Sequence, residues 1–471
     1  MERNCGSMKA LPCSLTLLVV FFSSFAEAQQ QPRGGNLPPT LFGSVSQGVP
    51  TGTATPLSIS DAIDRALKYN LGSIISEQET RTARAQRLRS LADLLPRVTG
   101  GVTETVEQIN LAAFGFGGFP GQPLVVGPFS VFDARARVTQ SVVDLKLLHD
   151  LRADTEKLNA SNYSQQDIRE LVVLIATDLY LEAVAGGSRV DAARAQLNTA
   201  QAVYDQAGDL RSAGVVAGID VLRAQVQLQA QQQRLVFAAN ELAKQRLNLA
   251  RAIGLPLGQD FTLTDMLATV PASLPNLDQT LNAALDARPD YLHANALVRA
   301  AEESRKAATS RRLPSVQFSG DYGDIGRSPA FSHGTMTLQA TLSIPIYDGR
   351  TRAETLESDS ILNQRKAEAA SLRDRIEYEI RTASLDIQAA AEQLKVAQGA
   401  RDLAQQQIVQ ARDRFAAGVA NSLELVQAQE AIATADENYI SSLYSLNIAQ
   451  ASLARAAGAA EKTIKSFLGG K

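Results

Sequence analysis

The chain has 471 residues, with 5% aromatic residues, no Trp and a formal net charge of −3. This charge excludes a strongly basic surface for nucleic acid or anionic lipid, so we expect no nucleic-acid partner. The scarcity of aromatic residues disfavours a compact globular core and suits long helices packed along seams of small residues.

Residues 1–28 are predicted to be a signal peptide. Arg3 and Lys9 precede an apolar run over 15–25, and the sequence AEA at 26–28 is an A-x-A cleavage site. Met8 could equally be the true start. The apolar run is too short to cross a membrane as a helix, so we expect an exported protein.

Both cysteines lie inside this segment, at Cys5 and Cys13. The mature chain would therefore have no disulfide and no thiol chemistry. Lipidation of Cys13 is the alternative, but Pro12 precedes it and the apolar run follows it, which fits simple secretion better.

Residues 29–56 are rich in Pro, Gly, Gln and Thr and are expected to form a flexible N-terminal leader. The first helix is predicted to begin within "TPLSISDAIDRAL", where Ser58 and Asp61 have the spacing of a capping box.

The rest of the chain is an internal duplication. Residues 138–254 align without a gap onto 342–458, an offset of 204 (418 − 214 at a shared glycine). Upstream, "LPRV" at 95–98 aligns with "LPSV" at 313–316, an offset of 218 (313 − 95). The first repeat has the longer loop, a Phe-rich stretch over 114–132. The resulting division is a first repeat over 57–254, a linker over 255–276, a second repeat over 277–458 and a C-terminal tail over 459–471.

Each repeat is predicted to contain a helix, two strands, a very long helix, a tight turn and a returning helix, which makes the fold mainly α with a small β part. The strands alternate with period two. In "VFDARARVTQ", one face carries Phe132, Ala134, Ala136 and Val138, and the other carries Asp133, Arg135, Arg137 and Thr139. This pattern is typical of a transmembrane barrel strand, but a soluble hairpin that caps a helical domain would show it as well.

The predicted helices have matching lengths. The segments 145–212 and 350–415 could each run about 100 Å at the usual helical rise. Two shorter helices placed end to end cover the same length: 219–253 with 277–312, and 421–457 with 57–95. A wall of constant height requires this equality. The returning helices also carry a seam of alternating large and small residues, which we interpret as coiled-coil packing.

The turns after the two long helices have nearly the same sequence, "AGVVAGIDVLRAQ" in the first repeat and "AGVANSLELVQAQ" in the second. Gly214 and Gly418 are predicted to end the outgoing helices. The neighbouring Val215 and Val419 make both turns small and apolar. Either these are simple turns between helices, or they form a docking surface at the far end from the strands.

These residues resemble the TolC-like outer-membrane efflux proteins, also called outer membrane factors. The resemblance covers nearly the whole mature chain and rests on "LSISDAIDRALKYN", "ARPDY" at 287–291, "IPIYDGR" at 344–350, "RFAAGVANSLELVQAQ" and the duplication. It implies a homotrimer that forms a 12-stranded β-barrel in outer-membrane lipid, continued by a long α-helical barrel in the periplasm. The linker 255–276 and the C-terminal tail would form an equatorial belt around it.

The resemblance also implies a function and partners. The trimer would be the exit duct of a tripartite efflux pump or a type I secretion system. Its tips would dock onto a periplasmic adaptor, also called a membrane fusion protein, which links the duct to an inner-membrane pump. Four strands per chain leave two open edges, which lipid cannot satisfy, so closure needs several chains.

The family constricts near the tips with acidic side chains that face the axis. Asp220 and Glu424 occupy equivalent positions here and are the candidate periplasmic gate, although each also suits the first turn of a helix. The family's tyrosine and basic residue beside the glycine are replaced by Phe415 and Ala420. Asp209 with Arg211, and Asp413 with Arg414, are candidate substitutes for that lock.

No enzyme is expected, and no cofactor or metal. His149, His293 and His333 are scattered, and no metal-ligand spacing or phosphate-binding loop is present in the sequence. The alternative function is a periplasmic coiled-coil adaptor or scaffold without a membrane barrel. That alternative accounts for the seam and the tips but leaves the alternating strands and the matched helix lengths unexplained.

Overall fold

The computed structural model describes residues 39–467, apart from 116–122, 270–275, 418 and 421. The predicted signal peptide, the start of the leader, part of the Phe-rich loop and Gly418 lie outside the described residues. Everything below belongs to the compact unit that begins at Pro38.

The described elements follow the predicted order in both repeats. The first repeat comprises α1 (Ile59–Tyr69), α2 (Leu71–Ala92), β2 (Arg97–Asn110), β3 (Val125–Val143), α3 (Leu145–Ser212) and α4 (Gly218–Ile253). The second comprises α5 (Leu277–Ala287), α6 (Pro289–Ser310), β5 (Ser315–Gly326), β6 (Ser332–Ser343), α7 (Gly349–Ala416) and α8 (Ser422–Ala456). Shorter elements are η1 (Pro39–Phe42), β1 (Thr55–Leu57), η2 (Leu111–Phe114), β4 (Phe261–Leu263), η3 (Pro329–Phe331) and α9 (Ala460–Phe467).

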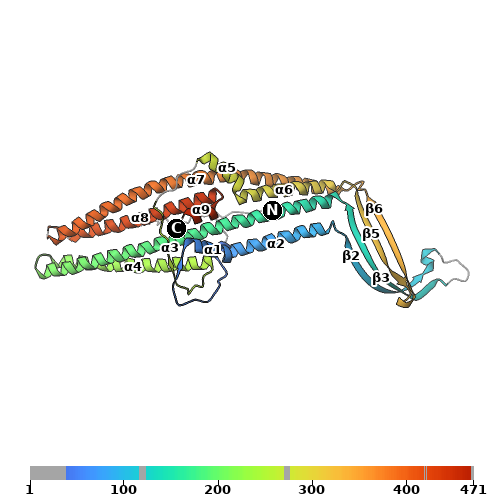
Figure 1. Ribbon diagram of the computed structural model, residues 1–471, viewed down its shortest axis with the longest axis horizontal. Helices are drawn as coiled ribbons and strands as arrows, with labels where there is room; N and C mark the ends of the chain where they lie inside the picture. Colours follow the sequence, from blue (N-terminus) through green and yellow to red (C-terminus); the bar gives the residue numbers. More distant parts are fainter. Residues whose placement is uncertain (1–38, 116–122, 270–275, 418, 421, 468–471) are drawn as a thin grey trace, which may run out of the picture. The chain divides into compact units, whose positions relative to one another are not determined.

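The helices form a wall four helices wide. The long helices α3 and α7 have 68 residues each, and α7 extends one residue beyond each end of the predicted segment 350–415. Along α3, helix α4 covers one half and α2 the other; α8 and α6 cover α7 in the same way (Figure 1). Since α3 also packs against α6 and α8, the order across the wall is α4 or α2, then α3, then α8 or α6, then α7.

The first helix of each repeat is broken, where the sequence predicted one continuous helix. The breaks fall at Asn70 and Arg288, which are equivalent by the offset of 218 (288 − 70). Asn70 caps α2 by accepting the Gly72 N–H at 2.8 Å, and its side-chain amide donates to the Leu41 carbonyl at 2.7 Å. Arg288 is followed by Pro289, which disfavours the helical conformation at the preceding residue.

At the second break, the buried guanidinium of Arg288 is held by two carboxylates. Its side chain is 2% exposed and donates to Asp290 at 2.6 Å, Glu379 at 2.7 Å and the Ala456 carbonyl at 3.3 Å. Burial would raise the pKa of Asp290, but the hydrogen bonds and charge of Arg288 outweigh burial and hold that pKa below its usual value. Helices α6, α7 and α8 are thus tied together at one point.

The leader differs from expectation. The sequence predicted a flexible segment over 29–56, yet from Pro39 onward the chain packs against the helix junctions. Leu41 is buried, Val45 N–H donates to the Tyr69 carbonyl at 2.9 Å, and β1 pairs in parallel with β4 of the linker. The Gln259 side chain holds the same segment by accepting from Thr51 N–H at 2.7 Å. A buried leucine and these backbone hydrogen bonds outweigh the Pro- and Gly-rich composition.

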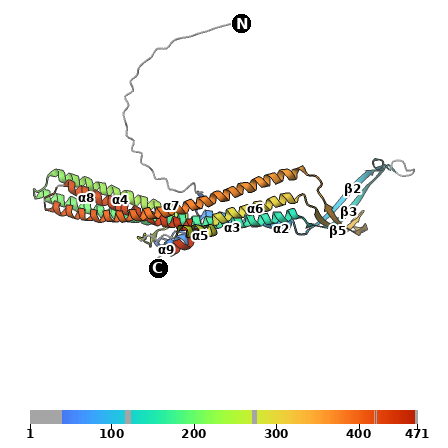
Figure 2. The same ribbon diagram turned by 90° about the horizontal axis from the view of Figure 1, so that it is seen from above.

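The four long strands form one antiparallel sheet in the order β2-β3-β5-β6. Strand β3 is therefore the junction between the repeats, because it pairs with β2 of its own repeat and with β5 of the other. The β2–β3 hairpin extends past the end of β5 and β6, since β5 pairs with β3 only from Phe132 onward (Figures 1 and 2).

Within the part of the chain that the structure describes, one helix, α3, is long and apolar enough by composition to cross a membrane. Within its most apolar stretch, 56% of the residues are buried against other parts of the protein. Its contacts with α2, α4, α6 and α8 account for this apolar character as packing inside the wall.

Two acids on α3 face the returning helices, Asp178 towards Tyr444 of α8 and Glu182 towards Gln245 of α4. Asp178 is half-buried and accepts a hydrogen bond from the Tyr444 hydroxyl. Burial raises the pKa of Asp178, against the hydrogen bond, which lowers it. Burial, and then the nearby charge of Asp178, raise the pKa of Glu182. Between the unfolded-state and the folded-state pKa the native protein binds more protons, so the free energy of unfolding falls as pH rises through this window.

We expect Asp178→Asn to raise the melting temperature of the detergent-solubilised protein at about pH 7.5, because the amide keeps an acceptor for Tyr444 without a buried charge. The difference from the unmodified protein should shrink towards about pH 5, where the carboxyl is increasingly protonated. Thermal unfolding at both pH values measures this. Asp402→Asn, on an exposed face of α7, is the control. A pH-independent difference would contradict this account of Asp178.

Candidate functional site

The sheet has one mainly apolar face, on which Glu104, Gln140 and Asp324 also lie, and one polar face. No described helix covers the mainly apolar face. Its apolar side chains are largely exposed, for example Val102 at 74% and Leu338 at 66%. The other members are Val98, Val106, Ala134, Ala136, Val138, Val316, Phe318, Tyr322, Met336, Ala340 and Leu342. The described helices do not pack on this face, which resembles the outward band of a membrane barrel strand.

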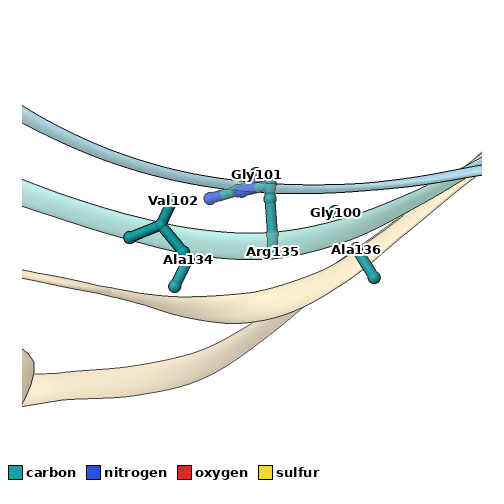
Figure 3. A pocket seen from close by; sticks show the side chains of 6 residues that line it. All are labelled: Gly100, Gly101, Val102, Ala134, Arg135 and Ala136. Carbon is teal, nitrogen blue, oxygen red and sulfur yellow. The ribbon is translucent and has the colours of Figure 1, made fainter.

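The opposite face carries hydroxyl, amide and charged side chains. Arg135 donates to Asp133 at 2.6 Å and to Asp321 at 2.8 Å, so one cation links β3 and β5. Figure 3 shows the Arg135 side chain on the opposite side of the sheet from Ala134 and Ala136, around a shallow hollow of about 310 Å³. The predicted alternation of faces is therefore confirmed at these positions.

Both edges of the sheet are open in the single chain. Among the described strands, nothing pairs with the outer side of β2 or of β6. Beyond β6, the "IPIYDG" segment exposes Tyr347 at 91% together with Ile344 and Ile346. An apolar face combined with unpaired backbone at both edges is stable in lipid only if another chain supplies the missing strands.

The two edges of the helix wall also expose apolar stripes. On α7 the exposed residues are Tyr378, Leu385, Val396 and Leu403, which are spaced by seven and eleven residues and so share one helix face. On α4 the stripe is Ile219, Val226 and Phe237, with the same spacing. The edges of the sheet and of the wall are thus incomplete on the same two sides of the chain.

The first tip is the turn between α3 and α4. Gly214 has φ +74°, and Val215 N–H donates to the Leu210 carbonyl at 2.9 Å, which closes the end of α3. A left-handed residue at this position suits glycine, as the sequence predicted. Helix α4 then begins at Gly218 without a side-chain cap.

The second tip joins α7 to α8, and two of its residues, including Gly418, lie outside the described part of the chain. Val419 N–H donates to the Arg414 carbonyl at 3.1 Å. The exposed apolar side chains at the two tips form what we call the tip patch: Val215, Ile219, Leu222, Val419 and Leu423. Val215 and Ile219 are the counterparts of Val419 and Leu423 in the other repeat.

The two candidate gate acids lie in different surroundings. The Asp220 side chain is 17% exposed, accepts a hydrogen bond from the Ser422 hydroxyl at 2.6 Å and lies 3.4 Å from Arg223. The Glu424 side chain is 42% exposed and pairs with Arg414 at 3.0 Å. The Ser422 hydrogen bond joins the two tips directly. Sequence reasoning missed it, because no spacing along the chain indicated that position 422 would face position 220.

Phe415 is the residue that takes the place of the tyrosine expected from the family resemblance. Its side chain is buried beneath the tips and is 1% exposed. It packs with Ala207, Ala224 and Leu425, so it belongs to the core between the two helical hairpins. Arg414, which the sequence suggested together with Asp413 as a substitute for the family's lock, pairs with Glu424. Within one chain, an apolar core and the Ser422–Asp220 hydrogen bond therefore join the two tips, and the Arg414–Glu424 ion pair links the two helices of the second tip.

No cluster of His, Cys, Asp or Glu suited to a metal ion occurs among the described residues. His149 instead pairs with Glu303 at 2.7 Å, and His293 with the Ala160 carbonyl at 2.8 Å, both between α3 and α6.

Comparison with known proteins agrees with this architecture. Residues 280–459 match the family described as outer membrane efflux protein. The toluene efflux pump outer membrane protein TtgC of Pseudomonas putida is 25% identical over 413 residues, covering 82% of this chain and 81% of that one.

Solved channels share the fold. The Vibrio cholerae outer membrane protein VceC has a TM-score of 0.74 at 14% identity, covering 86% of this chain and 97% of that chain. The Campylobacter jejuni CmeC outer membrane channel has a TM-score of 0.74 at 16% identity, covering 89% and 92%. The matched domain and the sequence relatives are thus those of outer membrane efflux proteins, and the solved structures show that the chain shares their fold.

Proposed function

We propose that three copies of this chain form the outer-membrane exit duct of a tripartite efflux pump or of a type I secretion system. Twelve strands would close the barrel in the outer membrane, and the helix walls would continue it through the periplasm. The duct conducts passively, while a periplasmic adaptor and an inner-membrane pump supply substrate and energy. TtgC is named for toluene efflux, so small organic molecules are the proposed cargo.

The single observation that carries the proposal is a sheet with an exposed apolar face and two unpaired edge strands. This sheet continues into a helix wall whose two outer helices expose apolar stripes. A soluble adaptor or scaffold would leave a row of apolar strand residues in water, at a cost of about 25 cal/mol per Å². Only closure with further copies, in lipid, satisfies both the apolar face and the unpaired edges.

The tip patch supports the proposed adaptor partner. Its five apolar side chains lie at the end of the wall farthest from the strands, where lipid is absent. An apolar patch exposed to the aqueous periplasm is characteristic of a protein-binding surface.

We expect the protein to sediment with the outer membrane, to need detergent for extraction and to have the mass of three protomers by light scattering. The physical reason is that closure of the sheet requires partner strands and a lipid-like environment. A folded, monodisperse monomer in detergent-free buffer would exclude the duct and favour the scaffold alternative.

We expect the pair Asp220→Asn with Glu424→Gln to shift the ion selectivity of the duct in planar bilayers towards anions. Three copies of each acid around the axis would repel anions, and removal of the acids leaves Arg223 and Arg414 uncompensated. The reversal potential in a salt gradient measures the shift.

Asp402→Asn removes one acidic charge from α7, about 20 Å from the tip by helical rise, and serves as the control for loss of a distant charge. Adding Arg414→Gln to the double variant should return part of the selectivity, because it removes the exposed cation. A reversal potential unchanged in the double variant would rule out an acidic ring at these positions.

We expect Val215→Lys or Val419→Lys to abolish export while trimer mass and outer-membrane fractionation stay normal. A lysine in the tip patch would bury a charge in the adaptor contact. Val215→Ala and Val419→Ala are the matched controls and should retain most export. Full export by the lysine variants would show that the tips are only turns between helices.

A further inference from the structure

A groove lies between helices α4 and α8, over the tip-side half of α3. Both helices pack on α3 but make little contact with each other, and Figures 1 and 2 show them running beside α3 towards the tips. The groove has a volume of about 630 Å³. Sites for drug-sized ligands typically have volumes of about 300–1,000 Å³. Neither the proposed conduction nor the proposed adaptor contact uses this groove.

Small side chains make the hollow, and larger apolar side chains line it. Gly186, Ala192 and Ala193 of α3 form the floor, and Leu242 and Phe237 of α4 form one wall. Phe237 is 66% exposed, so its ring is available to a ligand. It also belongs to the exposed stripe on α4, so the groove opens beside the outer edge of the wall.

One hydrogen-bond acceptor in the groove is unused. The side-chain amide of Gln245 donates to Glu182 at 3.5 Å, but Gln245 Oε1 is buried and accepts no hydrogen bond from the described residues. Gly186 admits this oxygen, because a Cβ at that position would overlap it. A buried acceptor without a donor is costly, so the groove offers a place for an N–H group.

The groove carries more carboxylates than cations. Four carboxylates and two arginines line it: Glu241, Glu430, Asp436, Glu437, Arg189 and Arg234. Both arginines are engaged, Arg189 with Glu437 at 3.0 Å and Arg234 with Glu430 at 2.7 Å. An anionic ligand would therefore have to break one of these ion pairs.

Glu241 is the lining acid that is held least from other helices. Arg401 of α7 neutralises Asp436 at 2.8 Å, whereas Glu241 pairs with Lys244 of its own helix, a cation whose side chain is 59% exposed. Burial first, then the charge of Asp178 and also that of Glu241, raise the pKa of Glu182. These carboxylates repel one another, and a bound cation would relieve the repulsion.

Three chemically different groups lie in a line along α4. Phe237, Glu241 and Gln245 are spaced by four residues, which places them on one face of the helix. The line is about 12 Å long by helical rise. It offers an aromatic ring, a carboxylate and an unused acceptor in succession.

We infer that this groove binds a protonated amine that carries an aromatic or other apolar group. The ammonium would donate to Glu241 and to Gln245 Oε1, and the apolar part would lie against Phe237 and the small residues of the floor. A cation beside the Phe237 ring is also attracted to its face. The inference does not rest on the proposed function, because all these residues belong to one chain.

Dansylcadaverine tests the inference, because it joins a primary ammonium to a fluorescent naphthalene. Fluorescence titration of the detergent-solubilised protein gives its Kd, after subtraction of a titration into protein-free detergent. Two comparison probes are N-acetyl-dansylcadaverine, which is neutral, and 6-(dansylamino)hexanoate, which carries a carboxylate. We expect the amine to bind roughly tenfold more tightly than either, as a hydrogen bond to a charged group warrants.

Three variants test the assigned contacts. Glu241→Gln should weaken binding of the amine about tenfold and remove its preference over the acetylated probe. Phe237→Ala should weaken binding of the amine about fivefold. Ala192→Leu fills the floor and should weaken binding of all three probes. Glu392→Gln, which changes an exposed acid of α7 outside the groove, is the matched control and should bind the amine normally.

Equal Kd values for the amine and the acetylated probe would overturn the ammonium site, as would unchanged binding by Glu241→Gln. No binding of the amine above the detergent blank would overturn it as well. Light scattering on the same samples separates this inference from the duct. A trimer that does not bind the amine loses the groove alone, whereas a monomer that binds it keeps the groove and excludes the duct.

Discussion

Backbone hydrogen bonding at the two open strand edges is the constraint on which the rest of the structure depends. Each unpaired N–H and C=O in a bilayer costs several kcal/mol, so a sheet that has an apolar face cannot remain open in lipid. The chain supplies only four strands and continues their edges into the outer helices of the wall. Closing the strands with further copies, as proposed, would therefore also cover the outer edges of the helix wall.

The helix wall keeps its thickness because two short helices lie end to end beside each long helix. A helix break, at Asn70 in the first repeat and at Arg288 in the second, lies where the short helices meet. The first repeat uses a neutral amide at Asn70, and the second uses the buried cation Arg288 with Asp290 and Glu379. The glycines that end α4 and α8, Gly254 and Gly458, have nearly the same left-handed φ, +73° and +74°. The two repeats thus use different side chains at their helix breaks, but share the left-handed glycine that ends the returning helix.

Much of this architecture could be predicted from the sequence, because period-two strands, long unbroken helices and an internal repeat are local or additive patterns. The capping box at Ser58 and Asp61 and the extents of α3 and α7 were predictable for that reason. The helix breaks and the packed leader were missed, because they depend on contacts such as Asn70 with Leu41, residues 29 positions apart. At the tips the glycine turn was predictable, while the Ser422–Asp220 hydrogen bond depends on how two hairpins pack.

The long β2–β3 hairpin has a consequence for the surface of the cell. It reaches past the β5–β6 hairpin, and around a closed barrel tall and short hairpins would alternate. Antibodies, bacteriophages and proteases in the surrounding medium would meet the tall hairpins first. Sequence drift there would change how the bacterium is recognised from outside while the conduit beneath keeps its dimensions.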